Sequence, residues 1–445
     1  MPPESNSQKN PDADAPKTTI PSPIPKMGRV LTAILIVAGF AEMAYGIVNF
    51  SAMPVYIKAL SLPEQWIAGM ASAYLITEGL LKSPFGLLGD RFGRKRLVLA
   101  GPIISTFTAL LTPFIHNPYI LLFLRVLDGA GLAALWPSAF SLIGDYAAKE
   151  RQASAMSLFN ISYMVGIAFG PAIGGIINDA AKNLFHLTEA SSKQASFYVA
   201  SVLFAATAIT AYFMIPDKHP HVVAKTPEQE LHAEGGISLK DFKKMLGRMP
   251  ALLALAATTF LGVGMVMAYA KLFIMERFVL SESAYGTLLI APALIIGAAS
   301  IPLGTLSDKI GKERAIKIGM TLCTMGFWAL ILLPSYRTTL VVLGSLVGIG
   351  FVIAFPAMMA KVSGDCEPSQ RGAALGAIGT AQGLGAIIGV SLSGFLYKVG
   401  AFTVFGQLVP EHGLPFLGCA IMLLFATTIA WTSLHRDKLQ TPPPS

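Results

Sequence analysis

The segment Gly86-Leu-Leu-Gly-Asp90-Arg91-Phe-Gly93-Arg94-Lys95 returns in the second half of the chain as Gly304-Thr-Leu-Ser-Asp308-Lys309-Ile-Gly311-Lys312-Glu313. In both copies an acid, a glycine and basic residues keep the same spacing directly after a long apolar stretch. The similarity continues at four further pairs of places, namely Pro137 and Pro356, Gly144-Asp145 and Gly364-Asp365, Arg151 and Arg371, and Gly170 and Gly389. A repeat over so much of the chain predicts two halves with the same architecture.

The composition is that of a membrane protein. Of the 445 residues, 53% are hydrophobic and 13% are charged, and the mean hydropathy is +0.61, whereas a soluble domain carries about 25% charged residues. Lipid offers no partners for backbone groups, and no alternating strand pattern occurs, so we expect an all-α membrane protein with twelve transmembrane helices in two pseudo-symmetric six-helix halves. The expected spans are 29–50, 66–88, 97–115, 119–141, 154–177, 196–215, 250–274, 284–305, 315–334, 338–360, 372–396 and 414–434.

Basic residues gather on one side of these spans. With the amino terminus inside, most Lys and Arg residues fall on cytoplasmic segments, which predicts a multi-pass protein of the plasma (inner) membrane with both termini in the cytoplasm. The net charge of +8 is then a consequence of topology and gives no support for a nucleic-acid partner. We expect a monomer in contact with membrane lipid.

Polar segments flank and divide the two halves. The expected parts are a disordered cytoplasmic tail (1–27), the first half (28–215), a cytoplasmic linker (216–249), the second half (250–436) and a short tail (437–445). In the linker, Leu239, Phe242, Leu246 and Met249 recur at helical spacing among basic residues. This pattern predicts an amphipathic helix that either lies on the inner leaflet or is a solvated connection.

The first copy of the repeated segment matches G-x-x-x-D-[RK]-x-G-[RK]-[RK], and on this motif the chain resembles major facilitator superfamily transporters over roughly residues 28–436. The matching residues are Gly86, Asp90, Arg91, Gly93, Arg94 and Lys95, with Asp308 and Lys309 in the second copy. Asp90 lies where a helix is expected to end, so it can meet basic side chains and the positive end of a neighbouring helix. We expect these contacts to hold the cytoplasmic gate in one conformation.

A second motif lies in the span 154–177. Gly166, Gly170, Pro171, Gly174 and Gly175 match G-x-x-x-G-P-x-x-G-G, which characterises the proton-driven exporters of the superfamily. Glycines four residues apart allow helices to pack backbone to backbone, and a proline bends the helix. The span 372–396 keeps the glycines but has Val390 where the proline would fall, so the motif belongs to one half and favours export over import.

Ionisable residues within the spans are candidates for proton coupling, because charge in lipid is costly. They are Glu42, Glu78, Arg125 and Asp128. Glu42 resembles the first-helix acid of multidrug antiporters, and Arg125 begins a segment similar to the family's R-x-x-Q-G-x-G motif, with Asp128 in place of glutamine. Both Glu42 and Arg125 lie about 20 Å from the inner face, so the sequence allows a pair that separates when Glu42 is protonated. Arg125 and Asp128 can equally neutralise each other, and which carboxylate takes the proton stays open.

Other polar or aromatic residues in the spans are candidates for the substrate cavity, since their spans line the central cavity in the superfamily. They are Tyr45, Asn49, Lys82, Asn160, Tyr163, Tyr269, Phe355 and Gln382. Lys82 follows Glu78 by four residues, a spacing that predicts an ion pair facing either protein or substrate. Lys271 is expected at the outer end of the span 250–274, with its amine reaching the interface.

No motif indicates catalysis, a cofactor or a metal. The sequence has no P-loop, G-x-S-x-G or H-E-x-x-H pattern, and its cysteines (Cys323, Cys366 and Cys419) stand singly. We therefore expect no enzyme but a secondary transporter of the drug-efflux type, which exchanges protons for a hydrophobic or amphipathic small molecule by alternating access. The alternatives are a proton-linked flippase for a lipid or glycolipid, a proton-coupled importer of a sugar or organic acid, and a membrane receptor that does not transport.

Overall fold

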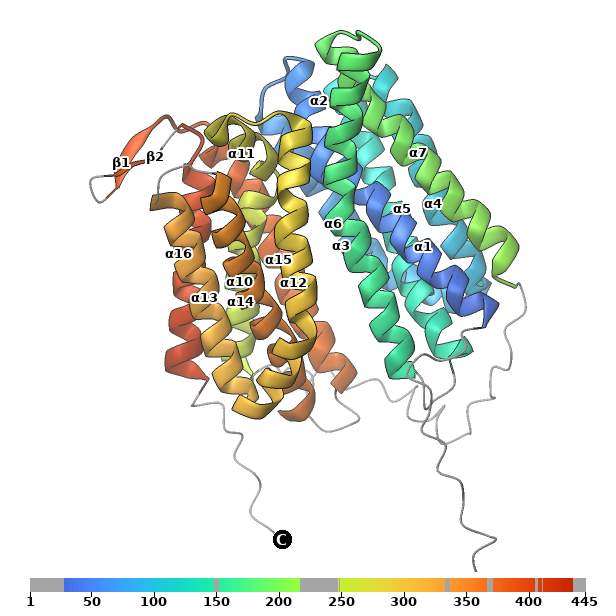
Figure 1. Ribbon diagram of the computed structural model, residues 1–445. Coiled ribbons are helices and arrows are strands. Elements are labelled where there is room, and N and C mark those ends of the chain that lie inside the picture. The colour runs from blue at the N-terminus through green and yellow to red at the C-terminus, as the bar shows by residue number, and fades with distance from the viewer. Residues whose placement is uncertain are drawn as a thin grey trace, which may run out of the picture.

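Twelve long helical segments in two bundles of six make up the described part of the computed structural model (Figure 1). The structure describes residues 28–147, 152–216, 247, 249–332, 337–365, 371–404, 407–409 and 411–434. The two predicted tails and most of the linker, including the predicted amphipathic helix at Leu239, Phe242 and Leu246, lie outside these residues. Within them, the all-α membrane fold predicted from the sequence is confirmed.

The first bundle contains α1 (Arg29–Gly46), the π-helical segment η1 (Ile47–Ala52), α2 (Met53–Ala59), α3 (Gln65–Phe92), α4 (Arg94–Leu111), the short 3-10 turn η2 (Thr112–Phe114), α5 (Pro118–Tyr146), α6 (Gln152–Leu184) and α7 (Glu189–Met214). The second contains α10 (Pro250–Met267), α11 (Ala270–Phe278), α12 (Glu282–Ile310), α13 (Lys312–Leu332), α14 (Arg337–Asp365), α15 (Arg371–Leu396) and α16 (Leu414–Ser433). One large apolar core lies mainly in the first bundle and extends into the second at Ala268, Tyr269, Leu272, Val390 and Tyr397, and another lies within the second bundle.

The two bundles repeat one packing scheme. In the first, α1 packs on α6 and α7, and α5 packs on α3 and α4; in the second, α10 packs on α15 and α16, and α14 packs on α12 and α13. The repeated sequence segment forms the same turn twice. Gly93 ends α3 with φ +98° and Gly311 ends α12 with φ +90°, a backbone conformation that glycine adopts without strain, and the next helix begins at once.

The first helix of each half is interrupted at the same place. In the register that aligns Gly86 with Gly304, Phe50 corresponds to Ala268. Phe50 lies in η1, where the helix continues with π geometry, whereas the expected span 250–274 breaks at Ala268–Tyr269 into α10 and α11. A second departure from the expected all-helical chain is a two-stranded antiparallel ribbon, β1 (Phe402–Val404) with β2 (Gln407–Val409), in which Phe402 pairs with Val409.

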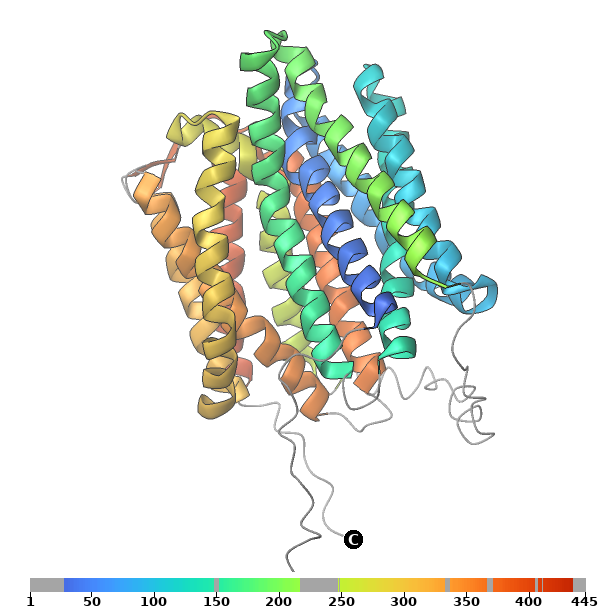
Figure 2. The ribbon, with the colours of Figure 1, turned by 45° about the vertical axis from the view of Figure 1, so that its right-hand side comes forward.

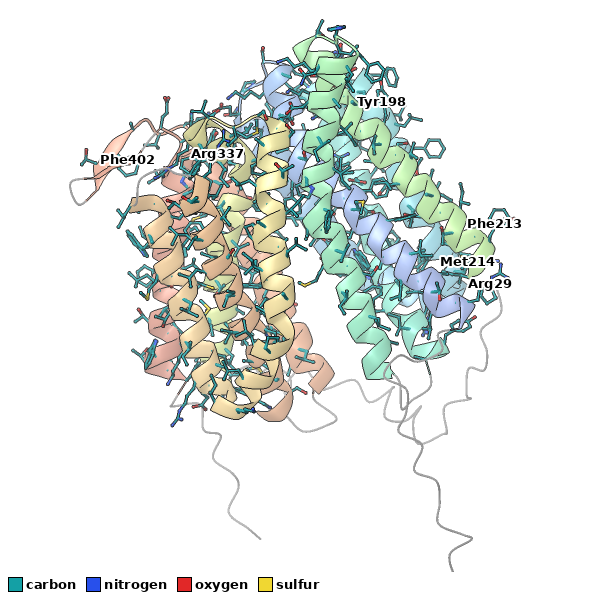
Figure 3. The ribbon with its side chains drawn as sticks, viewed as in Figure 1. Arg29, Tyr198, Phe213, Met214, Arg337 and Phe402 are labelled. Carbon is teal, nitrogen blue, oxygen red and sulfur yellow. The ribbon has the colours of Figure 1, made fainter. Side chains whose placement is uncertain are left out.

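Eleven helical segments are apolar and long enough to cross a membrane, among the residues that the structure describes. The twelfth, α3, has 28 residues but carries Glu78 and Lys82 in its middle. Large apolar side chains cover the outside of the bundles, as Figure 3 illustrates for Tyr198 and Phe213 on α7, whose exposed fractions are 37% and 69%. An apolar exterior of this extent is suited to lipid, and the chain is an integral membrane protein.

The two bundles touch at one end only, as far as hydrogen bonds and ion pairs between described residues show. The topology predicted from the sequence makes this the outer end; α6 meets α7 and α11 precedes α12 there, while α1 begins and α16 ends at the opposite end, the predicted inner end (Figures 1 and 2). Ser72 of α3 bonds to Ser391 of α15 at 3.1 Å, and Asp179 of α6 accepts a bond from the Ser283 amide of α12 at 2.8 Å. The structure is therefore closed at its outer end.

Close glycine crossings bind α4 to α5 and, at the corresponding place, α13 to α14. A Cβ atom added at Gly131 would lie 2.9 Å from the Gly101 carbonyl oxygen, and one at Gly350 would lie 2.6 Å from that of Gly319. We expect Gly131→Ala to lower the free energy of unfolding by about 1–3 kcal/mol, since overpacking forces the helices apart. Thermal unfolding in detergent measures this. Gly344→Ala is the control, because nothing lies within 4 Å of a Cβ there; equal melting temperatures would contradict the prediction.

Candidate functional site

Glu42 is a buried acid that forms no ion pair with the residues that the structure describes. It lies on α1 with an exposed fraction of 6%, and its Oε2 atom has no hydrogen-bond partner. Tyr163 of α6 interacts with the carboxyl group through its hydroxyl. A Cβ at Gly166 would lie 2.8 Å from the Glu42 Cβ, so this glycine makes the space that Glu42 occupies. A buried polar atom without a partner is unusual in folded proteins, which marks Glu42 as a functional candidate.

Arg125 and Asp128 form a buried ion pair within α5. Nη1 of Arg125 lies 2.9 Å from Oδ2 of Asp128, and both side chains are 1% exposed. Thr108 donates a second bond to Oδ1 of Asp128 at 3.2 Å. The structure therefore has the local pairing that the sequence allowed, and Arg125 forms no ion pair with Glu42 in this conformation. Nε and Nη2 of Arg125 remain without partners.

The Glu78–Lys82 pair predicted from the four-residue spacing is present on α3. Nζ of Lys82 lies 2.9 Å from Oε1 of Glu78, with side-chain exposures of 49% and 18%. The lysine therefore neutralises a partly buried acid near the middle of α3, and this acid has the cationic partner that Glu42 lacks.

Aromatic side chains surround Tyr163. Its ring lies 5.3 Å from Trp136, and Trp136 lies 5.6 Å from Phe159, with near-perpendicular planes in the second contact. Phe140 completes the group at 4.9 Å from Phe159. Sequence reasoning did not identify this cluster. The spacing of four residues between Trp136 and Phe140, and between Phe159 and Tyr163, places each pair on one face of its helix and could have predicted two aromatic faces. The cluster gives the carboxyl of Glu42 an apolar aromatic neighbour.

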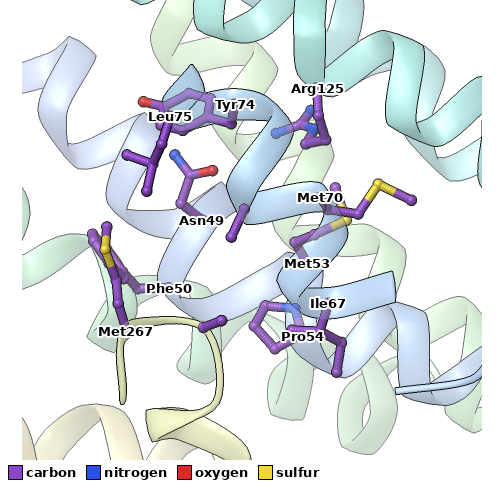
Figure 4. Close-up of a pocket in the computed structure, with 12 residues that line it drawn as sticks. Asn49, Phe50, Met53, Pro54, Ile67, Met70, Tyr74, Leu75, Arg125 and Met267 are labelled. Carbon is purple, nitrogen blue, oxygen red and sulfur yellow. The ribbon is translucent and has the colours of Figure 1, made fainter. Parts of the chain in front are cut away.

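A small pocket lies near this region, between η1, α2, α3, α5 and the end of α10 (Figure 4). Its cavity volume is about 20 Å³, room for roughly one water molecule. Asn49 lines it, as expected for a cavity residue, together with the unexpected Tyr74 and Arg125. The remaining lining residues are apolar and are Phe50, Met53, Pro54, Ile67, Met70, Ala71, Leu75, Met267 and Ala268. In this conformation the pocket is too small for a substrate.

Two of the expected cavity residues are placed elsewhere. Tyr45 is 2% exposed in the core of the first bundle, where its hydroxyl lies 2.8 Å from Ser105. Tyr269 is fully buried at the outer junction, donates to the Glu64 carbonyl at 2.8 Å and stacks on Tyr397. Neither residue lines either of the two small spaces of this conformation, so their place in a substrate cavity stays a prediction.

The second half carries aromatic residues where the first carries charge. Phe260 occupies the position that corresponds to Glu42, and it packs with Phe351 and the predicted cavity residue Phe355. These rings line a second small space, of about 20 Å³. Gln382 is half-buried, and its Nε2 has no partner. The side chain of Asn160 lies outside the described part of the structure.

Basic residues of the repeated loop bind the ends of neighbouring helices. Arg94 donates to the Ser141 carbonyl at 3.1 Å, and its counterpart Lys312 donates to the Ala360 carbonyl at 2.9 Å. Cations are favourable at helix carboxyl ends, so each half attaches its turn to the helix that carries these carbonyls. Lys95 lies over the ring of Tyr212 at 5.3 Å, and Arg91 and Lys309 are exposed. The side chains of Asp90 and Asp308 are not among those described, so their gate role remains a prediction.

The glycines of the second motif serve two neighbours. Cβ atoms at Gly166 and Gly170 would press on α1 and one at Gly174 on η1, whereas one at Gly175 would press on the Glu282 carbonyl of α12. Helix α6 therefore packs closely on its own half and on the opposite half at once. Pro171 lies inside α6, next to Gly46 of α1.

Lys271 does not reach the interface. Its exposed fraction is 2%, and it donates to Ser51 and to Glu282. The prediction was wrong because the helix breaks before Lys271 and α11 turns it toward the other half. Glu282 and Lys193, which join this contact, were not singled out, since no spacing along the chain connects them.

Comparison with known proteins agrees with this architecture. The profile of the Major Facilitator Superfamily matches residues 34–278 and 252–445, so the chain belongs to this family of transporters. It is 22% identical over 390 residues to Multidrug resistance protein 2 of Bacillus subtilis, covering 86% of this chain and 91% of that protein. It is 28% identical over 277 residues to the multi-drug resistance efflux pump PmrA of Streptococcus pneumoniae, covering 60% and 64%.

Solved structures share the fold. A bacterial homologue of the human lysosomal transporter Spinster, in an inward-facing and unoccupied conformation, superimposes with a TM-score of 0.74 at 16% identity, over 93% of this chain and 98% of that one. A D-xylose–proton symporter gives 0.70 at 14% identity, over 92% and 98%. The TM-scores indicate a common fold, and sequence identities this low carry no information on the substrate.

Proposed function

We propose that this transporter is a proton-coupled antiporter of the cytoplasmic (inner) membrane that exports hydrophobic or amphipathic small molecules. The observation that carries the proposal is Glu42, a buried carboxyl group with an unpartnered oxygen in a membrane-spanning helix. Burial favours the neutral acid and a nearby cation favours the carboxylate, so a change in surroundings between two conformations loads and unloads a proton.

Arg125 is the partner we assign to Glu42 in the other conformation. Two of its nitrogens, Nε and Nη2, and one oxygen of Glu42 lack partners in the present one. Unmet buried donors and acceptors cost about 1–3 kcal/mol each, and a bidentate contact between the two groups would satisfy all three atoms. Asp128 would hold Arg125 in place through Nη1 in both conformations.

The linings of the pockets support an apolar substrate. Both small spaces between the helices are lined mainly by aromatic, aliphatic and methionine side chains, which adapt to varied apolar ligands. A sugar would require several converging hydroxyl and amide groups, and the described lining residues supply few. The named multidrug relatives agree with this choice.

A lipid flippase is the second candidate, and a groove on the side of the second bundle favours it. The groove has a volume of about 500 Å³ and lies along α10 and α15, where Leu384 and Ile388 are 56% and 49% exposed. An acyl chain fits such a surface. No aromatic residue is among the described residues that line it, and this absence of an aromatic rim ranks the flippase second.

Transport by the purified protein tests the proposal. Vesicles that contain the protein and a pH-sensitive dye are exposed to lipophilic cations, neutral drugs, D-xylose and short-chain lipids in turn. We expect the drugs to trigger proton movement, and vesicles without protein to give none. Proton movement with D-xylose alone would establish the importer, and flux with lipid alone would establish the flippase.

A further inference from the structure

A buried cluster of charges lies at the outer junction of the bundles, and none of its charged residues is among those that line the pocket of Figure 4. Its centre is Glu282, the first residue of α12, with an exposed fraction of 2%. Oε2 of Glu282 accepts hydrogen bonds from Asn178 of α6, at 3.0 Å, and from Lys271; Oε1 accepts one from Lys193 of α7. Asn178 and Lys193 belong to the first half and Glu282 to the second, so this carboxylate joins the halves.

We propose that Glu282 is the residue that holds the outer gate closed, and that Lys271 connects this gate to helix α1. Opening the outer end must separate α12 from α6 and α7, which removes Asn178 and Lys193 from the carboxylate. Removing one partner of a buried ion pair leaves an uncompensated charge. The closed state is therefore the one in which the buried charges of this cluster are paired.

The charges and the backbone around Glu282 both favour its contact with the first half. Two acids, Glu282 and Asp179, face two lysines, so the formal charges balance. Asp179 accepts a bond from the Ser283 amide at the start of α12, where the helix dipole also favours the carboxylate of Glu282. Gly175 lets the Glu282 carbonyl approach α6. Both the backbone and the side chain of Glu282 therefore contact the first half.

Lys271 reaches the helix that carries Glu42. Its amine donates to both the carbonyl and the hydroxyl of Ser51, each at 2.9 Å. Ser51 lies in η1, the π-helical segment that directly follows α1, and such segments occur frequently at functional sites. Opening the gate frees Lys271 from Glu282 or pulls on Ser51, and either change is transmitted to α1.

An exposed ion pair at the same end provides the control. Lys58 of α2 and Glu276 of α11 also join the two halves, but their side chains are 49% and 39% exposed. Exposed pairs contribute little to stability, so the proposal requires that Glu282 and Glu276 behave differently although both are acids that bridge the halves.

Thiol labelling of the full chain measures the gate. In a variant without the native cysteines, Ala71→Cys reports on the pocket below the outer junction, and Gly79→Cys reports on the inner opening, next to the exposed Lys82. A membrane-impermeant maleimide is applied to right-side-out and inside-out vesicles. We expect Glu282→Gln to raise labelling at position 71 at least about fivefold from the outer side and to lower it at position 79 from the inner side. Glu276→Gln should change neither rate by more than about twofold.

Three results would overturn the proposal. Equal labelling in Glu282→Gln and Glu276→Gln would show that the buried cluster holds nothing closed. A rise at both reporter positions would show general loosening instead of gate opening. Should Glu282→Gln not fold, as judged by gel filtration, Lys271→Gln and Glu282→Asp are measured instead, and unchanged labelling in both would have the same meaning. The proposal rests on alternating access alone, so labelling needs no substrate and remains informative even if antiport is not found.

Discussion

Glu42→Gln is expected to abolish substrate-triggered proton movement, down to the level of vesicles without protein. Glutamine keeps the size of the side chain and its contact with Tyr163, but it neither binds nor releases a proton. Dye-loaded vesicles measure the proton signal, and the fluorescence of Trp136, which lies beside Tyr163, reports substrate binding. We expect binding to persist, because a neutral amide costs less to bury in an apolar surrounding than a carboxylate does.

The matched control for this variant is Glu78→Gln. Both acids lie in membrane-spanning helices of the first half, but Glu78 already has Lys82 as its partner. If Glu42 alone couples protons, Glu78→Gln retains proton movement, although with an unpaired lysine its rate falls. A proton signal that survives in Glu42→Gln and disappears in Glu78→Gln would transfer the coupling role to Glu78 and refute the present assignment.

Gly175→Ala should reduce transport nearly to background by a different route. A methyl group at this position would lie 2.8 Å from the carbonyl carbon of Glu282, closer than atoms pack. The carbonyl oxygen and carbon of Glu282 belong to the backbone, so they cannot rotate away from the methyl group as a side chain could. Helices α6 and α12 must therefore separate. We expect the outer end to remain open, so that the protein cannot return to the conformation that is closed there and transport stops. Uptake into vesicles measures the loss.

Gly297→Ala on α12 controls for the change of residue itself. Nothing lies within 4 Å of a Cβ at Gly297, and alanine favours a helix over glycine by about 1 kcal/mol. This variant should therefore transport as the wild type does and be at least as stable. Full transport in Gly175→Ala would mean that the helix crossing relaxes, and the tight contact would then have no part in the cycle.

The general fold could be predicted because it depends on quantities that are local in sequence. Hydropathy located the twelve spans, and the repeated turn at Gly93 and Gly311 followed from a glycine pattern that needs no knowledge of neighbours. The end of the expected span 250–274 was missed, because a break at Ala268–Tyr269 leaves no trace in an apolar run. The strands β1 and β2 were missed for a related reason, since three-residue strands are too short to show a period.

The site was predictable only in part, for a physical reason. Sequence spacing found the pairs within one helix, Glu78 with Lys82 and Arg125 with Asp128. It could not find contacts such as that of Glu282 with Lys193, in which the partners lie on different helices of different halves. Lys271 was misplaced by the same limit, because the turn of α11 decides which way its side chain faces.

The interruption of the first helix in each half has a mechanical consequence. α1, η1 and α2 form a continuous rod from Arg29 to Ala59, since the backbone stays helical through η1. The matching position of the second half, at Ala268, is a joint between α10 and α11. A rod passes a displacement at one end to the other, whereas a joint absorbs it. The first helical segments of the two halves thus differ in stiffness, and the stiffer one is the segment that contains Glu42.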